Sequence, residues 1–401
     1  MKILIVSQYF WPEEFRINDL AIDLVERGHE VSVLTGNPNY PKGKFYQGYG
    51  FKFFAENYRG IKIYRVPLVP RGSASGFCLA INYVTFAFFS SFFALFHKGQ
   101  YEKIFAVNYS PITAVYPAIL FKKRHKIKLY LWIQDLWPES VSAAGKIKSR
   151  FVMNFLTRMV KNIYKNADKI LVQSEAFIPS LKEKGATEKQ LGYLPNWAED
   201  LFNDNSKISK SKYNSIIPEG FRVMFAGNIG EAQDFDSIIK AMEKTLNFPE
   251  IKWIIVGDGR KKSWVENEII RLGLDNTVFL LGRYPLNDMP SLFIHADIML
   301  LSLKDEEIFS MTIPGKIQSY MAFGKPILGM LNGIGAEVLR DANCGYVANA
   351  GDYNSLANNI ITAYKQESKI LLEKGINGRN YYTQNFSKKV IIDNLMKIFQ
   401  E

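Results

Sequence analysis

The sequence predicts an α/β protein made of two parallel-sheet domains in tandem, and three observations support this. Short apolar runs rich in β-branched residues alternate with helical stretches, which is typical of parallel strands joined by crossover helices. The alternation stops in a polar segment at 198–221 and then starts again. A length of 401 residues also suits two domains. We expect a first domain at 1–197, a second at 198–386, and an amphipathic helix at about 387–401 that packs back on the first.

Each expected strand is a short apolar run. In the first domain these runs are KILIVS, EVSVLT, KIFAVN, KLYLWIQ and KILVQS, and in the second they are FRVMFAG, KWIIVGDG, TVFLLG, ADIMLLS and KPILGM. Residues 36–62, rich in Gly, Pro, Tyr and Lys, interrupt the pattern and are expected to form a long polar insertion. Because parallel strands end at one edge of a sheet, ligands are expected there, in a cleft that both domains face.

The composition restricts the chemistry. A net charge of +11 indicates an anionic partner, which the charge alone leaves open among nucleic acid, a phosphorylated substrate and an acidic membrane face. Cys78 and Cys344 are far apart and form no metal or disulfide pattern, so a reducing compartment, the cytoplasm, is expected. The four histidines fit neither a catalytic triad nor a metal site.

One segment is apolar enough to meet a membrane. Between Arg71 and His97 the chain has no charged residue, but it contains several Ser, Asn and Thr, and strands are expected on both sides of it. A spanning helix is therefore disfavoured. Two alternatives stay open, namely a helix lying partly in the membrane interface and a helix buried in the domain. The neighbouring FKKRHKIK, Lys98 and Lys103 would supply the cations that attract an acidic leaflet.

Three strand-to-helix turns in the second domain favour an anion. FAGNIG at 225–230 and VGDGRKK at 256–262 have glycines that let the backbone approach a ligand, and IPGK at 313–316 opens a helix with Lys316 in its first turn. Helix-start amides and the helix dipole favour phosphate. The same residues would also suit structural roles alone, namely a tight turn, or a proline at a helix start followed by a solvated lysine. Three such turns together predict binding of a nucleoside diphosphate.

Two segments of the first domain carry polar groups after strands. SQYFWPEEFRIND at 7–19 contributes Trp11, Arg16 and Asn18. WIQDLWPES at 132–140 contains Asp135, a carboxylate among apolar neighbours that suits acid–base or hydrogen-bonding work, or that caps the next turn.

Taken together, these segments resemble the retaining glycosyltransferases of family four, which have the GT-B fold of two Rossmann-like domains facing a central cleft. The resemblance covers essentially the whole chain. It rests on the opening strand–loop–helix with RGHEV, on ADKILVQSE and LPNW, and on FAGNIG, VGDG, LLGRYPLNDMPSLFIHADIMLLS and IPGKIQSYMAFGKPIL in that order. QYFWPEEFRIND, DLWPES and IPGKIQSYMAFGKPIL are most similar to the WbuB- and WcaI-like group of N-acetyl-L-fucosamine or fucose transferases.

The resemblance implies a donor nucleotide in the second domain and an acceptor at the first. Together with the residue patterns above, it gives Asp135, Lys316 and Arg16 as the expected catalytic residues. The implied donor-binding residues are Gly227, Asn228, Gly230, Gly257, Arg260, Arg283, Tyr284, Thr312, Ile313, Gly315, Lys316 and Ser319. The implied acceptor-binding residues are Trp11, Arg16, Asn18, Tyr40 and Trp137. No metal and no cofactor are expected, because the nucleotide sugar is itself a substrate.

The chain departs from the family pattern at several positions. Many members carry two glutamates eight residues apart, and here those positions are Met311 and Ser319, with Glu306 and Glu307 out of register. The usual arginine of the first glycine turn is Asn228, and the lysine that follows is absent, with Gln233 in that region. Lys316, Arg16 or Arg260 would then meet the diphosphate charge.

The expected function is transfer of a sugar from a UDP-sugar, best UDP-N-acetyl-L-fucosamine, to a polyprenyl-diphosphate-linked saccharide in O-antigen or capsule synthesis. A GDP-fucose or other nucleotide-sugar transferase is the alternative. The enzyme would sit peripherally on the cytoplasmic face of the inner membrane, held by a basic and aromatic surface. Two other classes are a sugar-nucleotide epimerase, whose glycine loop is absent after the first strand, and a basic nucleotide- or nucleic-acid-binding protein. Nucleic acid is not the expected partner, because it would not explain three glycine turns.

Overall fold

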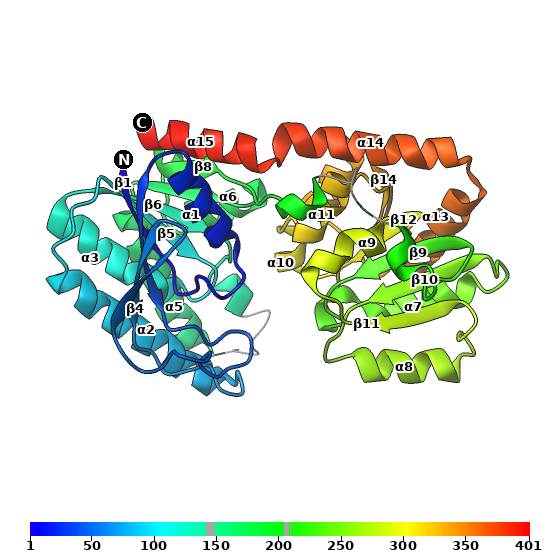
Figure 1. Ribbon diagram of the computed structural model, residues 1–401, viewed down its shortest axis with the longest axis horizontal. Helices are drawn as coiled ribbons and strands as arrows, with labels where there is room; N and C mark the ends of the chain where they lie inside the picture. Colours follow the sequence, from blue (N-terminus) through cyan, green and yellow to red (C-terminus); the bar gives the residue numbers. More distant parts are fainter. Residues whose placement is uncertain (142–148, 204–207, 209) are drawn as a thin grey trace. The chain divides into compact units, whose positions relative to one another are not determined.

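A computed structural model describes residues 1–141, 149–203, 208 and 210–401 (Figure 1). The chain forms two compact units, one of Met1–Leu194 with Leu395–Glu401 and the other of Pro195–Asn394. The expected boundary after 197 thus lies three residues further along the chain than the observed one. Part of the expected polar linker also belongs to the second unit, because Phe202 stacks on Phe293 with ring centroids 5.3 Å apart.

The first unit contains an eight-stranded sheet of order β3-β4-β2-β1-β5-β6-β7-β8. All described pairs are parallel except β3 with β4. Its strands are β1 Lys2–Val6, β2 Glu30–Gly36, β3 Phe54–Tyr58, β4 Ile61–Val66, β5 Lys103–Asn108, β6 Lys128–Ile133, β7 Lys169–Val172 and β8 Leu191–Tyr193. Central strands such as β1 are buried on both faces, which explains their unbroken apolar sequence. The insertion at 36–62 was expected to be only polar loop, but its end forms the antiparallel strand β3, whose alternate residues are exposed.

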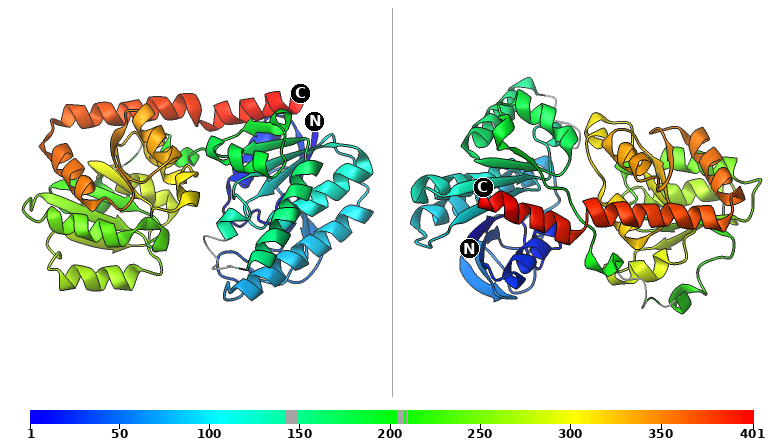
Figure 2. Two further views of the ribbon diagram at one scale, coloured as in Figure 1. Left: turned by 180° about the vertical axis from the view of Figure 1, so that it is seen from behind. Right: turned by 90° about the horizontal axis from the view of Figure 1, so that it is seen from above.

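Helices cover both faces of this sheet. They are α1 Arg16–Glu26, α2 Gly76–Phe96, α3 Tyr116–His125, α5 Arg150–Asn166 and α6 Ile178–Glu183. Right-handed crossovers that run in opposite directions place α1 on one face and α2, α3 and α5 on the other. The contacts of α3 with both α2 and α5 agree with this, and both helices lie in front of the first sheet when it is seen from behind (Figure 2).

The second unit contains a six-stranded parallel sheet of order β11-β10-β9-β12-β13-β14. Its strands are β9 Phe221–Ala226, β10 Ile251–Val256, β11 Val278–Gly282, β12 Ile298–Ser302, β13 Ile327–Met330 and β14 Gly345–Ala348. Its helices are α7 Phe235–Lys244, α8 Lys262–Arg271, α9 Met289–Phe293, α10 Glu307–Ser310, α11 Gly315–Phe323, α12 Ile334–Asp341, α13 Tyr353–Lys365 and α14 Ser368–Asn385.

Two hydrophobic cores hold this second sheet, one on each face. One core joins the sheet to α7, α8 and α13, and the other joins it to α9, α11, α12 and α14. The last helix, α15 Lys388–Gln400, ends in residues that belong to the first unit. There Phe399 packs on Tyr130, with ring centroids 4.8 Å apart. In each unit the parallel strands end at one edge of the sheet, and the candidate residues lie in the segments that follow these strand ends.

Candidate active site

The turns after β9 and β10 interlock through their backbones. The N–H of Ile229 donates to the carbonyl of Asp258 at 2.9 Å, and the N–H of Lys261 donates to the carbonyl of Ile229 at 3.0 Å. A side chain would not fit between the turns, because a Cβ on Gly257 (φ +153°) would lie 1.8 Å from the carbonyl oxygen of Gly227. The glycines predicted from the sequence therefore allow close approach of two strand ends.

Lys316 lies directly over the first of these turns. A Cβ on Gly227 would lie 2.6 Å from the Cε and 2.7 Å from the Nζ of Lys316. The ammonium stands 3.7 Å from the ring centroid of Phe225, and its Nζ is buried without a hydrogen-bond partner among the described residues. Burial lowers the pKa of Lys316 to about 7. A buried cation without a counter-ion is costly, so this site is suited to a ligand that brings negative charge.

The start of helix α11 adds backbone donors beside this cation. Pro314 precedes the helix, and none of the described side chains caps its first turn. The N–H groups of Gly315 and Lys316 therefore have no intrahelical acceptor. With the helix dipole and Lys316, they form a concentrated positive site, as the opening letters of this helix predict.

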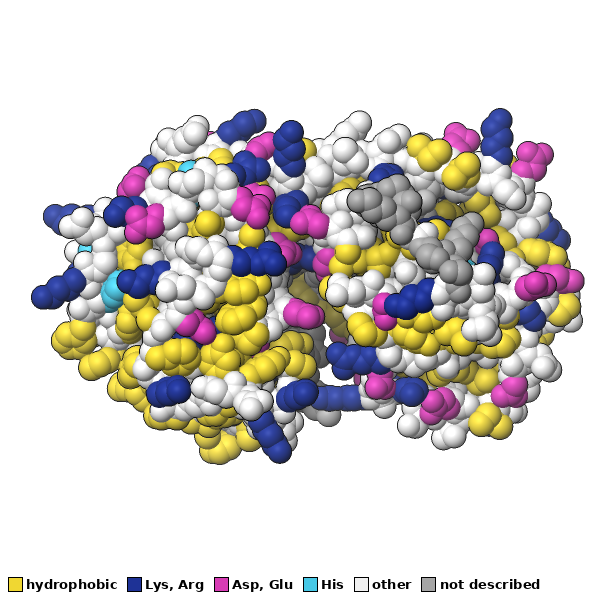
Figure 3. All heavy atoms as spheres, viewed as in Figure 1, with side chains coloured by type: hydrophobic (Ala, Val, Ile, Leu, Met, Phe, Trp, Pro, Cys, Tyr) yellow, Lys and Arg dark blue, Asp and Glu magenta, His cyan; other side chains and the backbone are white. Residues whose placement is uncertain are grey.

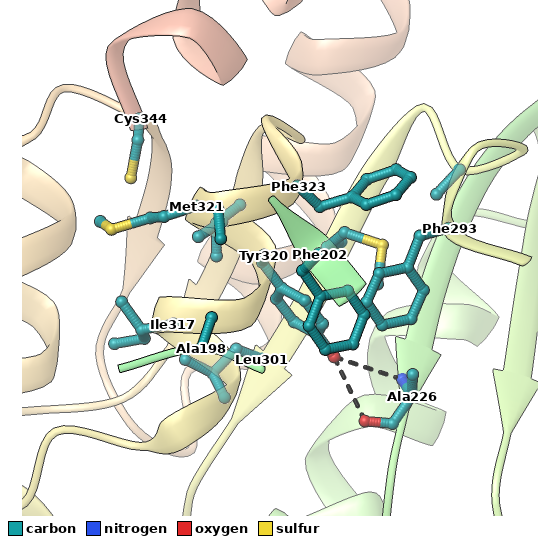
Figure 4. Close-up of a cluster of buried hydrophobic side chains, with 14 of the residues drawn as sticks. Ala198, Phe202, Ala226, Phe293, Leu301, Ile317, Tyr320, Met321, Phe323 and Cys344 are labelled. Carbon is teal, nitrogen blue, oxygen red and sulfur yellow. Dashed lines mark hydrogen bonds between the residues drawn. The ribbon is translucent and has the colours of Figure 1, made fainter. Parts of the chain in front are cut away.

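Tyr320 fixes α11 against the end of β9. Its hydroxyl donates to the carbonyl of Ala226 at 3.2 Å and accepts from the N–H of the same residue at 3.4 Å (Figure 4). Ile317 and Met321 on the same helix are buried in the core. This packing holds Lys316 over the glycine turn that follows Ala226. No local sequence pattern indicates this contact between distant segments.

A carboxylate reaches α11 from the segment that follows β8. The Ser319 hydroxyl lies 3.3 Å from Oε2 of Glu199 and 3.2 Å from the carbonyl oxygen of Gly315. Ser319 is one of the two positions where the family pattern has glutamate. The structure thus brings Glu199, which sequence reasoning missed, to a position where the expected carboxylate is absent.

Several other predicted donor residues are exposed or contact neighbours of their own. Arg260 and Arg283 are exposed, Tyr284 packs edge-on against Tyr213 with centroids 5.3 Å apart, and the Asn228 amide is 3.5 Å from Gln233. Gly230 and Ile313 line the turns themselves.

Two groups in this region already have partners within the fold. Thr312, a predicted donor-binding residue, donates its hydroxyl to the carbonyl of Ile308 and its N–H to the carbonyl of Phe309. The cations before α8 were considered for an anion, yet Lys261 pairs with Asp236 at 2.7 Å.

In the first unit, Asp135 follows β6 in a half-buried position. Its backbone N–H donates to Asn108 at 3.1 Å, and the Asn108 amide donates to its carbonyl at 2.9 Å. No described residue donates a hydrogen bond to its carboxylate, so the capping alternative finds no support. Burial raises the pKa of Asp135 to about 7. Nearby Trp137 is buried, and its Nε1 has no partner among the described residues.

The loop after β1 is held by an internal network. Both the N–H of Asn39 and that of Tyr40 donate to the buried Glu13 carboxylate at 2.7 Å. The Asn18 amide accepts from the N–H of Trp11 at 3.0 Å and donates to the carbonyl of Glu13 at 2.6 Å. Asn18 and Glu13 thus shape the loop, and Arg16 lies at the start of α1, 3.9 Å from Asp19.

Tyr40 belongs to an aromatic cluster on this loop. Its ring centroid lies 5.9 Å from that of Tyr9 and 5.4 Å from that of Phe15, and the Arg71 guanidinium lies 5.0 Å from the Tyr40 ring. Trp11 instead stacks on Tyr58 at 4.2 Å. The predicted acceptor residues Trp11, Asn18 and Tyr40 are therefore close in one loop system, whereas Trp137 lies with Asp135.

Comparisons with known proteins agree with this geometry. A model described as Glycosyl transferase 4-like domain matches residues 14–197, and one described as Glycosyl transferases group 1 matches residues 207–381. The chain is a glycosyltransferase of the group 1 type.

Several relatives show the breadth of this glycosyltransferase group. The chain is 25% identical over 339 residues to WcaI of Escherichia coli (strain K12), covering 81% of this chain and 82% of that protein. It is 30% identical over 225 residues to WbjE of Pseudomonas aeruginosa, covering 53% of each. The solved structure of Anabaena HepE in complex with UDP and glucose covers 100% of both chains at 19% identity, with a TM-score of 0.68. This glycosyltransferase has the GT-B fold.

Proposed function

We propose that this glycosyltransferase moves a sugar from a UDP-sugar to a polyprenyl-diphosphate-linked saccharide in the synthesis of a bacterial surface polysaccharide. The observation that carries the proposal is the buried ammonium of Lys316, which has no hydrogen-bond partner among the described residues and lies beside the glycine turn and the start of α11. UDP is favoured because the structure of HepE, which has the same fold, contains UDP. The resemblance favours UDP-N-acetyl-L-fucosamine as the donor, and GDP-fucose is the alternative donor.

Lys316 would act on the leaving diphosphate. Negative charge develops on that group as the sugar bond breaks, and a preorganised cation with helix-start amides stabilises it most in the transition state. The donor's charge would restore the ordinary pKa of Lys316, so that the lysine is fully protonated when it is needed. The transfer is proposed to retain anomeric configuration and to need no metal.

The two carboxylates would have separate tasks. Asp135, whose pKa burial raises to about 7, would accept the acceptor's proton or bind a sugar hydroxyl. Glu199, hydrogen-bonded to Ser319 on the helix that carries Lys316, would accept hydrogen bonds from hydroxyl groups of the donor. Arg16, Tyr40 and Trp137 would contact the acceptor saccharide. An acceptor of this kind would place the enzyme peripherally at the cytoplasmic face of the inner membrane.

A thermal-shift panel with UDP, GDP, ADP and dTDP, without added metal, tests the donor class. We expect a selective rise with UDP in the wild-type chain and in Lys365→Met, and a smaller rise in Lys316→Met. Lys365 is a matched control, because its ammonium also lies over a phenylalanine ring, 5.2 Å from Phe248, but on an exposed surface. A rise with GDP alone would turn the proposal to fucose donors, and an equal rise in both lysine variants would refute the role of Lys316.

A further inference from the structure

Helix α2 has an unusual distribution of side chains. Its inner stripe consists of Asn82, Phe86, Ser90 and Ala94, which recur every four residues and are buried. Its outer face carries large apolar residues at Phe77 (76% exposed), Val84 (64%), Phe88 (63%), Phe92 (51%), Leu95 (50%) and Phe96 (65%). A surface helix of a water-soluble domain normally has the opposite pattern, with polar residues outside. The alternative of a helix buried in the domain is therefore wrong.

The apolar surface continues beyond α2 onto the loop before β3. Phe51 (57% exposed) and Phe53 (46% exposed) both stand edge-on to Phe89, with centroids 5.3 Å and 5.9 Å away. Between β3, β4 and α2 lies an apolar groove of about 440 Å³, lined mainly by Phe53, Phe92, Phe93 and Phe96. Figure 3 shows hydrophobic side chains gathered over the part of the first unit where Figure 1 places α2. Single exposed apolar residues are ordinary, but a contiguous patch of this kind marks an interaction surface.

Cations predominate around this surface, although Arg65 is buried in a pair with Glu56 and Lys122 pairs with Asp168. Between residues 57 and 134 Glu102 is the only carboxylate, whereas lysines and arginines are frequent. These are Arg59, Lys62, Arg65, Arg71, Lys98, Lys103, Lys122, Lys123, Arg124, Lys126 and Lys128. Arg124, in the last turn of α3, donates to the carbonyl of His97 at 3.0 Å, which places that cationic turn at the end of α2. Lys52 stands between Phe51 and Phe53 in the sequence and is exposed.

We infer that α2 and the loop at Phe51–Phe53, named here the aromatic face, insert into the interfacial region of an anionic lipid bilayer. The apolar side chains would displace lipid headgroups, and the surrounding cations would select acidic lipids. A second copy of the chain would meet the same cations with like charge, so a bilayer suits this surface better.

On this proposal helix α2 lies in the interfacial plane of the bilayer and does not span it. By length and composition it is long and apolar enough to span a bilayer. Its inner face, however, is fixed to the domain, because Asn82 accepts from the Gln8 amide at 2.7 Å and donates to the carbonyl of Val69 at 2.6 Å. Packing on α3, β2 and β4 also holds it against the sheet. The bilayer contact needs no nucleotide, so it stands or falls separately from the proposed donor.

Vesicle flotation of the full chain tests this inference. The vesicles contain phosphatidylcholine alone or with one third phosphatidylglycerol. We expect binding to the anionic vesicles and at least about tenfold less binding by the double variant Phe88→Asp/Phe92→Asp. Ile270→Asp is the matched control, since Ile270 is 68% exposed on α8 of the second unit, and it should bind as the wild type does. A triple variant Lys62→Gln/Lys98→Gln/Lys123→Gln should lose the preference for anionic vesicles.

A native thiol offers a second readout. Cys78 lies partly exposed in the first turn of α2, whereas Cys344 is buried. A polarity-sensitive dye on Cys78 should shift to the blue when anionic vesicles are added. Binding that Phe88→Asp/Phe92→Asp leaves unchanged would overturn the inference. So would light scattering that shows a wild-type dimer dissolved by the same substitutions, because a second copy would then cover the aromatic face.

Discussion

Lys316 in the second unit and Asp135 in the first are opposite cases of the same physical situation. Each is an ionisable group beside a strand end with no partner for its charged atoms among the described residues, and burial brings each pKa to about 7. The lysine reaches that value from above and the aspartate from below, because burial disfavours the charged form of either. One site therefore attracts negative charge, and the other holds a group that can exchange a proton near neutral pH.

The largest expected effect is at the cation. Lys316→Met keeps the apolar stem over Phe225 and removes the charge, so kcat should fall about a thousandfold while the chain stays folded. Steady-state kinetics with the UDP-sugar identified by the panel would measure this. Lys365→Met should keep wild-type kinetics, and a Lys316→Met enzyme with normal kcat would contradict the role assigned to the ammonium.

The second largest effect on activity is expected at the carboxylate of Asp135. Asp135→Asn should lower kcat about a hundredfold, because the amide cannot accept a proton from the acceptor. The remaining activity should also lose the rise with pH around 7 that titration of Asp135 gives the wild type. A pH–rate profile of the variant that is parallel to that of the wild type would remove Asp135 from the proton transfer.

A smaller effect is expected at the carboxylate that reaches α11. Glu199→Gln should raise the KM for the donor about tenfold with little change in kcat, because it weakens binding in the ground state and transition state alike. Exposed Glu250→Gln is the control. An unchanged KM would mean that Glu199 serves only to hold Ser319.

The shifted pKa values of Lys316 and Asp135 also make the stability of the fold depend on pH, with slopes of opposite sign. For Lys316 the unfolded chain binds more protons between pH 7 and the ordinary lysine pKa, so its contribution makes stability rise with pH there. For Asp135 the folded chain binds more protons between the ordinary aspartate pKa and pH 7, so stability falls as pH rises through that window. At about pH 8 both Lys316→Met and Asp135→Asn should raise the free energy of unfolding by roughly 1–3 kcal/mol. Denaturant titration of each variant checks this, and a loss of stability would mean that the group has a partner in the fold.

Sequence reasoning located the elements better than the contacts between them. Apolar runs revealed the strands that are buried on both faces. The partly exposed strands β3, β8 and β14 were missed. Lys316 was found because a strand, a proline and a glycine precede it. Glu199 and Tyr320 were not found from the sequence. Glu199 contacts Ser319, which is 120 residues away in the chain, and Tyr320 contacts Ala226, which is 94 residues away. Such meetings depend on how strand ends pack, which no local pattern specifies.

The most direct test of the central claim is the proton balance of donor binding. Calorimetry at about pH 8, in buffers that differ in ionisation enthalpy, gives the number of protons taken up when a UDP-sugar binds, and its diphosphate does not itself titrate there. Lys316 is then mostly neutral in the free protein, so binding should take up to about one proton, and Lys316→Met should take up none. If the wild type binds the donor with no proton uptake, or Lys316→Met takes up as many protons as the wild type, then Lys316 is not the group that meets the diphosphate.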